Sequence, residues 1–376
     1  LDANRLTFEC VTDACRHGAV VVNHVEAVAL LRQDGAVTGV SAKCALEGQE
    51  LQIRARVTVN AAGPWAEALL RGANVDAGGQ PLAWTRNLNV VMRQLLPHAA
   101  IGVSSRRASD SAVGNSRRLF FVTPWRDCSI VGTSHEPFNG DPDAVDISET
   151  ELQDFVDELA EAMPGMGVRR EDVHYVHSGL TPADLDEGGD PSRRAHRPAL
   201  RDHRAQGVQG FITAIGIKYT TAPVVAEHVT AMLSAVLGSS GKPSAAPRPS
   251  REDAGTPQLP GGLPAGDAEV AWATQIYGSR ASAVLSALTP GGTEVPRHVF
   301  RCRILHGIRH EMALRLTDGL FRCTDLVERG RLTADELEWC ADAFQSELGW
   351  SGERRSQELA LTKDQFARRH VRLRAA

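Results

Sequence analysis

The sequence predicts a mixed fold, α/β plus α+β, followed by an all-α C-terminal domain. Two segments, residues 57–71 and 211–236, each combine a strand, a tight turn and a helix, which is the βα unit of α/β proteins. Between them, residues 82–180 carry both strand and helix patterns, and beyond residue 267 every periodic segment is helical. The predicted domains are 1–81, 82–206 and 268–376, with 207–238 returning to the first domain and a linker at 239–267.

Composition excludes several classes of protein. The chain has 376 residues, of which 42% are hydrophobic and 23% charged, as in globular proteins. A formal charge of −5 argues against a general nucleic-acid binder. No apolar run reaches the length of a membrane-spanning helix. Seven cysteines without disulfide spacing indicate a reducing compartment, so we expect a cytoplasmic protein.

The first 56 residues predict a helix and then a β-meander. A helical face formed by Leu6, Cys10, Ala14 and Cys15 ends at Gly18. Strands are predicted at 19–22, 27–31, 36–41 and 51–56. Asp34-Gly35 and Glu47-Gly48 supply the positive φ that tight turns between such strands require.

The first strand-to-helix junction is small and apolar. A strand at 57–59 leads into Asn60-Ala61-Ala62-Gly63-Pro64-Trp65, and a helix follows as far as Gly72. Pro64 suits the first turn of a helix, where its missing N–H is not needed. Small residues leave room for a ligand near the helix start, although a plain, tightly packed turn would have the same sequence.

The middle region predicts strands at 119–122 and 129–131 around an Arg126-Asp127 turn, and another at 173–176. Ser148 and Glu151 form a capping box. The helix behind it has a single apolar face, made by Leu152, Phe155, Val156, Leu159 and Met163.

The second junction is the best functional candidate in the chain. A strand at 211–215 leads into Gly216-Ile217-Lys218-Tyr219-Thr220-Thr221, and the helix that follows ends at Gly238. Lys218 places a cation beside the positive end of that helix, which is unfavourable unless an anion binds there. The alternative is a solvated lysine next to an ordinary helix cap.

Helices are predicted at 268–277, 280–288, 301–316 and 334–348, the last behind a Thr333–Glu336 capping box. A zinc site is conceivable from Cys302, His306, His310 and Cys323. Structural zinc sites usually place short ligand pairs on loops, so we interpret these four as packing residues and predict no metal.

Four ordered motifs and the C-terminal helices resemble the FAD-dependent glycerol-3-phosphate dehydrogenases. The motifs are Asn60-Ala61-Ala62-Gly63-Pro64-Trp65, Gly132-Thr133-Ser134, Asn139-Gly140-Asp141-Pro142 and Gly216-Ile217-Lys218-Tyr219-Thr220-Thr221. The C-terminal match comprises His310-Glu311-Met312-Ala313, Leu316-Thr317-Asp318 and Glu347-Leu348-Gly349-Trp350-Ser351.

The resemblance implies a Rossmann-type FAD domain, incomplete in this chain, interleaved with a β-sheet substrate domain. It implies oxidation of sn-glycerol 3-phosphate to dihydroxyacetone phosphate, with quinone or oxygen as electron acceptor. Peripheral contact with the inner face of the cell membrane and a homodimer are further expectations. The implied FAD-binding residues are Ala27, Ala62, Gly63, Trp65, Gly216, Lys218, Tyr219, Thr220 and Thr221.

The substrate side departs from the family pattern. The family's G-x-R-P segment reads Gly179-Leu180-Thr181-Pro182 here, so the phosphate-binding arginine is replaced. Further departures are Leu88 in place of a histidine, His135 in place of an aspartate and Pro223 in place of an arginine. We expect Thr133, Thr181, Arg194 and Arg197 to bind substrate, although a solvated basic loop is the plainer interpretation of the arginines. Lys218 and His135 are the catalytic candidates.

The glycine fingerprint that opens the family's dinucleotide-binding unit does not occur in the sequence. We therefore expect an N-terminally incomplete chain, or one completed by a second polypeptide, that does not hold FAD tightly. Two alternatives stay open. The pocket could serve another hydroxy acid or an amine, or the chain could be a non-catalytic docking module.

Overall fold

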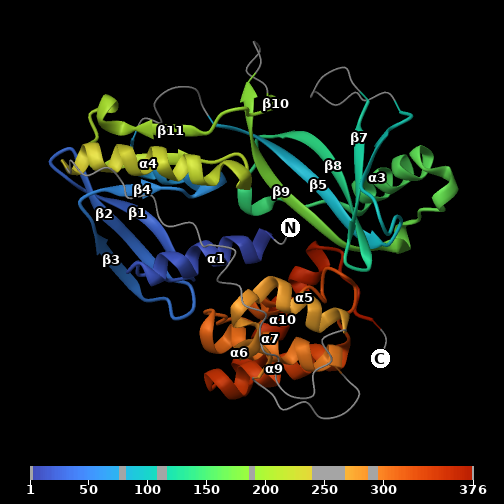
Figure 1. Cartoon of the computed structure of the whole chain (residues 1–376). Helices are drawn as coiled ribbons and strands as arrows, with labels where there is room; N and C mark the ends of the chain where they lie inside the picture. The colour runs from blue at the N-terminus through green and yellow to red at the C-terminus, as the bar shows by residue number, and fades with distance from the viewer. Residues whose placement is uncertain are drawn as a thin grey trace.

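The computed structural model describes residues 3–75, 82–107, 117–185, 191–238, 267–286 and 295–374, without the side chains of 191–194. Figure 1 shows three parts: a β-meander with neighbouring helices, a large sheet with α3, and the helical C-terminal region below them. The fold is thus mixed α/β with a helical C-terminal region, as predicted. The predicted linker lies outside the described residues except for Asp267, which caps the helix after it.

The N-terminal helix and meander are confirmed. Their elements are α1 (Ala3–Arg16), β1 (Val25–Gln33), β2 (Ala36–Cys44) and β3 (Glu50–Arg54). The three strands pair antiparallel in chain order, and Asp34 and Gly35 have φ of 50° and 79° in the first turn. The strand predicted at 19–22 is wrong: this segment pairs with no described strand, and Val20 is 92% exposed. The valines of this segment favour a strand, but a strand also needs a hydrogen-bonded neighbour, and no described strand lies beside it.

A second three-stranded sheet combines distant parts of the chain. It contains β4 (Thr58–Asn60), β11 (Ala199–Asp202) and β12 (Phe211–Ile215), in the order β11-β12-β4. The strands β4 and β12 are followed by α2 (Ala66–Gly72) and α4 (Ala222–Leu237), as both predicted βα units require. No residue of α4 is buried. Residues Tyr219–Leu237 are long and apolar enough to cross a membrane by length and composition, a test that core helices also pass.

The large sheet has six strands in the order β10-β9-β5-β8-β7-β6. They are β5 (Ala83–Arg93), β6 (Ile101–Ser104), β7 (Leu119–Trp125), β8 (Cys128–Phe138), β9 (Val173–Leu185) and β10 (Pro191–Arg194). The strand predicted at 173–176 continues for nine residues more, because β9 pairs with β5 as far as Ala183 and with β10 as far as Leu185. The second half of β9 contains polar residues and lacks an apolar run, so the sequence pattern did not predict a strand there.

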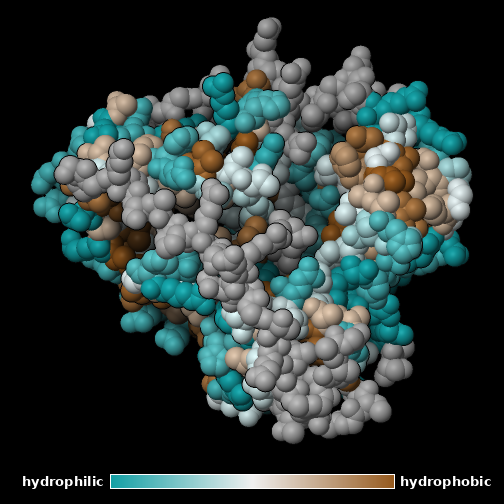
Figure 2. Space-filling model, in the orientation of Figure 1, coloured by the Kyte–Doolittle hydropathy of each residue, from teal (hydrophilic) through white to brown (hydrophobic). Residues whose placement is uncertain are grey.

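Helix α3 (Glu149–Ala162) covers one face of the large sheet. Its capping box is present, and the predicted face is buried. Beyond it, β7 alternates: Phe120 and Val122 point into this core, whereas Phe121 is 54% exposed. Figure 2 shows the hydrophobic residues gathered over β7 and α3.

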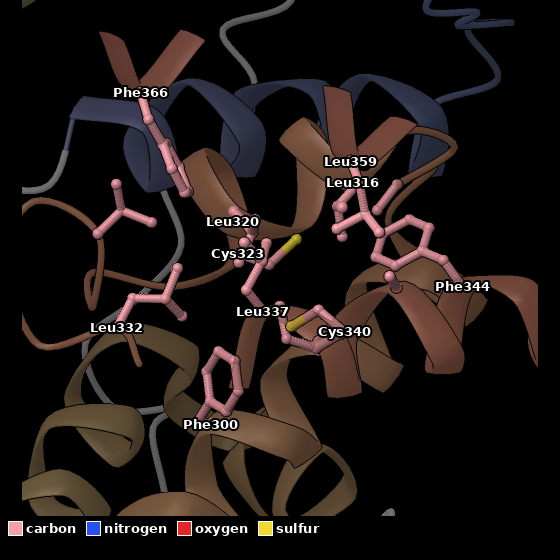
Figure 3. Close-up of a cluster of buried hydrophobic side chains, with 14 of the residues drawn as sticks. Phe300, Leu316, Leu320, Cys323, Leu332, Leu337, Cys340, Phe344, Leu359 and Phe366 are labelled. Atoms are coloured by element: carbon pink, nitrogen blue, oxygen red, sulfur yellow. The ribbon is translucent and has the colours of Figure 1, made fainter. Parts of the chain in front are cut away.

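The C-terminal region contains α5 (Ala268–Tyr277), α6 (Ala281–Leu285), α7 (Val295–His310), α8 (Leu316–Asp318), α9 (Ala334–Leu348) and α10 (Gly352–Arg368). The helix predicted at 301–316 begins earlier and ends at His310, because Met312 adopts φ of 53° and breaks the run. The Thr333–Glu336 capping box is confirmed. Figure 3 shows the core of this region, where side chains from α7, α8, α9 and α10 converge.

A network of buried charges fastens the helical region to the large sheet. The Oδ1 atom of Asp325 accepts from Nη1 of Arg303 at 2.7 Å. Its Oδ2 atom accepts from Nε of Arg126, in the β7–β8 turn, at 2.9 Å. Arg329 forms ion pairs with Asp325 and with Asp127, which lies in the same turn as Arg126. Burial alone would raise the pKa of Asp325, but Arg303, Arg126 and Arg329 outweigh it and hold that pKa below its usual range.

This depressed pKa makes the fold sensitive to acid. A carboxyl whose pKa is lower in the folded state than in the unfolded chain stabilises the fold above its unfolded pKa, about 3.9. We therefore expect a constant contribution between about pH 7 and pH 5, and its progressive loss as the pH falls below about 4. Urea unfolding at three pH values measures it. The Asp325→Asn variant should show a flatter acid dependence, and an equal slope in both proteins would contradict the assignment.

Candidate functional site

The two strand-to-helix turns lie side by side. Strands β4 and β12 pair in parallel, with Thr213 opposite Asn60. Since parallel strands end at the same edge of a sheet, residues 61–63 and 216–218 leave that edge together, although they are far apart in the sequence. The carboxyl edge of such strands is where α/β folds bind ligands.

The first turn is held by a buried asparagine. Asn60 is 3% exposed, and its Nδ2 donates to the carbonyl of Ala66 at 3.0 Å. Its Oδ1 accepts from the N–H of Ala62 at 3.2 Å. Gly63 adopts φ of 54°, where a side chain would be strained. Trp65 is exposed and donates from Nε1 to Asp143 at 3.0 Å, which ties this turn to the segment after β8.

The second turn presents an unneutralised positive helix start. Gly216, Lys218, Tyr219 and Thr220 are all exposed. No side chain caps the 3₁₀ turn at Tyr219–Thr221 or the helix α4 that continues it. Among the described residues, the Lys218 side chain makes no hydrogen bond and no ion pair. The free N–H groups of the helix start and the unpaired ammonium of Lys218 therefore lie close together. Such a site suits an anion or an electron-rich ring edge.

An apolar cluster connects both turns to the large sheet. Ala66, directly after the first turn, and Ile215, directly before the second, pack with Trp84 of β5. Phe138 and Leu180 complete the contact from β8 and β9. The two predicted turns are therefore placed next to one end of the six-stranded sheet.

The sheet carries a polar stripe on the face that α3 leaves uncovered. In the register of β5, Asn87 lies opposite His135 of β8 and Gly179 of β9. Asn87 is 8% exposed and donates to the hydroxyl of Thr181 at 2.9 Å, and Thr85 contacts the same hydroxyl at 3.0 Å. Buried polar groups in the middle of a sheet are costly unless they have partners, and the buried Oδ1 atom of Asn87 has none among the described residues, so we count this stripe with the candidate site.

The stripe leads into a cavity of about 670 Å³ between the sheet, the first turn of α1 and the helical region. His177, opposite Asn89 in the sheet, lines it. Burial, with a smaller contribution from the charge of Arg369, lowers the pKa of His177 to about 4, so the imidazole is neutral at pH 7. Thr7 of α1 donates to the hydroxyl of Tyr219 at 3.4 Å, so α1 connects the cavity to the second turn.

The remaining predicted residues are placed as follows. Ala27 is exposed on β1, in a different sheet from the two turns. Thr133 lies at a register shift of β8, and its hydroxyl donates to the carbonyl of Ser134 at 3.1 Å. Arg197 is exposed between β10 and β11, whereas the side chain of Arg194 lies outside the described part of the chain. Among the described side chains, those of Thr133 and Arg197 make no hydrogen bond or ion pair with either turn.

Cys302 and Cys323 are buried in two different apolar clusters. His306 lies 3.4 Å from the carboxylate of Glu311, and its ring packs on that of His310. Within the described residues, no group of three or more histidine, cysteine or acidic side chains is arranged to hold a metal.

Sequence reasoning did not identify Asn87 or His177 as site residues. A signal existed: polar Thr85, Asn87 and Asn89 alternate with apolar Leu88, Val90 and Met92, which is the pattern of a strand with one polar face.

Comparison with known proteins agrees with this architecture. The family model for FAD dependent oxidoreductases matches residues 1–232. Glycerol-3-phosphate dehydrogenase of Synechocystis is 25% identical over 252 residues, covering 64% of this chain and 44% of the relative. Alpha-glycerophosphate oxidase of Streptococcus pyogenes is 28% identical over 218 residues, covering 55% of this chain and 34% of the relative. The chain thus spans less than half the length of these relatives.

The fold is also that of a solved structure. Glycerol-3-phosphate dehydrogenase from Bacillus halodurans, solved as a complex with FAD, superposes with a TM-score of 0.79 at 21% identity. The match covers 99% of this chain and 74% of that one. Since the family model spans well over half of the sequence and the solved structure shares its fold, the chain belongs to the family of FAD-dependent oxidoreductases.

Proposed function

We propose that this chain is part of an enzyme that oxidises sn-glycerol 3-phosphate to dihydroxyacetone phosphate with FAD. The observation that carries the proposal is the parallel pairing of β4 and β12, which brings Gly63 and Gly216 to one edge of the sheet. Relatives named glycerol-3-phosphate dehydrogenase, at 25–29% identity, support this substrate over others.

The same proposal includes the arrangement of the FAD domain and the substrate domain. Strands β4 and β12 come from segments on either side of the large sheet, which is how a Rossmann-type FAD domain interleaved with a substrate domain is built.

The residues present fit the ring end of FAD. A Cβ atom added at Gly216 would meet nothing within 4 Å, so the backbone there is open to close approach. The start of α4 offers uncapped N–H groups, and Lys218 adds a cation without a counter-charge. Both would stabilise the negative charge that reduction builds on the pyrimidine edge of a flavin.

The chemistry divides between cofactor and protein. When bound, FAD would supply the acceptor for a hydride. The substrate loses this hydride from its carbinol carbon, and its hydroxyl proton goes to a basic side chain, which leaves the ketone. His135, half-buried opposite Asn87, is our candidate for the proton acceptor. Lys218 can take that role only after losing its own proton, so its cation serves better as an electrostatic partner of the flavin.

Substrate binding by Thr133, Thr181, Arg194 and Arg197 stays a prediction. The hydroxyl of Thr181 already contacts Thr85 and Asn87, so it offers a phosphate one hydroxyl rather than a guanidinium. This difference favours, as a second candidate, a hydroxy acid or an amine as substrate. Electron transfer to quinone or oxygen, a cytoplasmic location with peripheral membrane contact, and a homodimer complete the proposal.

A dye-coupled assay tests the substrate. Purified protein with added FAD should reduce an artificial electron acceptor when given glycerol 3-phosphate, and not when given glycerol. Faster turnover of a 2-hydroxy acid or an amine would replace the proposed substrate by the second candidate.

The turn itself is tested by Gly216→Val. Because the added side chain meets open space, we expect the variant to fold normally and to bind FAD at least about tenfold more weakly, since the valine would occupy the approach to the ring edge. FAD titration followed by fluorescence quenching measures the effect. Gly165→Val, also in open space but in the 3₁₀ turn after α3, is the control. Equal FAD affinity in the two variants would exclude the turn as a flavin contact.

A further inference from the structure

Two neutral polar side chains face each other where the polar stripe enters the cavity. Asn89 of β5 lies directly opposite His177 of β9, and both are half-buried. Among the described residues, neither side chain makes a hydrogen bond. Asn89 leans over the next strand, since a Cβ atom added at Gly132 would lie 1.6 Å from its Oδ1 atom. An amide and a neutral imidazole can each donate and accept, so this end of the stripe offers both functions to a ligand.

The rest of the stripe is uncharged as well. Thr85 and Asn87 are neutral, and the partner they share is another hydroxyl. The charged side chain between them, Arg86, lies on the opposite face of the strand and pairs with Glu151 of α3. From Thr85 to Asn89 the stripe measures about 14 Å, at about 3.4 Å per residue. A three-carbon chain is much shorter than that, so the stripe accommodates a longer ligand.

Beyond His177, positive and negative groups line the cavity in equal number. The guanidinium groups are those of Arg315, Arg322 and Arg369, and the carboxylates are those of Asp318, Glu328 and Glu358. A guanidinium only donates hydrogen bonds and a carboxylate only accepts them. A hydroxyl group does both, so one ligand with several hydroxyls can serve both kinds of group. A charged ligand would meet like charges in the same lining.

Aromatic side chains complete the lining. Trp125 of the sheet and Phe321 of the helical region are half-buried and border the cavity. Tyr175 packs edge-on against the ring of His177, with 4.7 Å between the ring centroids, and so holds the imidazole in place. Aromatic faces suit the C–H groups of a carbon chain, while the polar neighbours fix its orientation. Hydroxyl-bearing carbon chains have both kinds of surface.

We propose that this cavity, together with Asn89 and His177, binds a neutral polyhydroxy compound of four or more carbons, a polyol or a sugar. Hydroxyl groups of the ligand bond to Asn89 and His177, and its C–H groups lie against Trp125 and Phe321. The volume of about 670 Å³ leaves room for such a chain. The proposal concerns binding alone, so it holds whether or not the Lys218 turn contacts a flavin.

Saturation-transfer NMR on the flavin-free 376-residue chain tests the site, with sorbitol, glucose, glycerol and inorganic phosphate as probes. We expect saturable binding of sorbitol that salt hardly changes, because the ligand is uncharged. Glycerol, with three hydroxyls fewer, should bind at least about tenfold more weakly. Asn89→Ala and His177→Ala should each weaken sorbitol about three- to tenfold, the effect of a lost hydrogen bond. The control is His17→Ala, which removes an imidazole that is 61% exposed on α1, and it should leave the affinity unchanged.

The outcomes separate the parts of the proposal. No saturable binding of sorbitol or glucose, or equal affinities in the His177→Ala and His17→Ala variants, would overturn the site. Glycerol binding as tightly as sorbitol would overturn the longer chain, and displacement of sorbitol by inorganic phosphate would overturn the neutral ligand. Glucose binding more tightly than sorbitol would support the site and identify a ring form.

If His177→Ala fails to fold by circular dichroism, His177→Gln keeps a hydrogen-bonding group at that position and should retain part of the affinity. No flavin is present in these titrations, so their result is independent of the dye-coupled assay.

Discussion

Replacing Asp325 by asparagine is expected to lower the free energy of unfolding by about 3–5 kcal/mol, because it leaves the buried Arg303 without its counter-charge. The Asp325 side chain is 4% exposed, and so is that of Arg303, its partner at 2.7 Å. Arg126, the partner from the β7–β8 turn, is 7% exposed. Urea unfolding at pH 7, followed by circular dichroism, measures the change.

The matched control is Asp342→Asn. Asp342 also pairs with an arginine, Arg355, at 2.8 Å, but its side chain is 66% exposed. Exposed pairs contribute little, so we expect a change below about 1 kcal/mol. Similar losses in the two variants would show that the buried network is not what fastens the helices to the sheet.

Truncation of Phe344 to alanine is expected to cost about 3–5 kcal/mol, the usual range for a large side chain removed from a packed core. Phe344 is fully buried on α9, and its ring lies 5.2 Å from that of Trp350. In Figure 3 it borders the same cluster as Leu316 and Leu359. The surrounding helices cannot close over the lost volume without moving against each other.

Phe121→Ala is the control for this substitution. The same side chain is removed, but Phe121 is 54% exposed on β7, so little burial is lost and no closed cavity forms. We expect its unfolding midpoint in urea to stay close to that of the unchanged protein. A Phe344→Ala protein as stable as Phe121→Ala would mean that the helical core is loosely packed.

Local chemistry made much of the fold predictable. The meander follows from Asp34 and Gly35, whose positive φ values fit a tight turn, and α9 follows from a capping box at Thr333. Both signals act within a few residues. Strand β9 was underestimated because its second half is stabilised by pairing with β5, which is distant in the sequence.

The candidate site could also be predicted only in part. The turns at Gly63 and Gly216 could be predicted because strand, small residues and helix follow one another in the sequence. The cavity could not, since Arg322 and Arg369 come from separate segments of the helical region and meet His177 of the sheet only in the folded chain. Whether an arginine is paired depends on tertiary neighbours, which no spacing along the chain reveals.

The uncovered helix α4 has a consequence for handling the protein. None of its residues is buried, and β4 is the edge strand of the sheet beside it. Water wets such an apolar helix poorly, and a strand edge can pair with another chain. Solutions of this polypeptide should therefore turn from monodisperse to associating as they are concentrated, and mild detergent should reverse the trend.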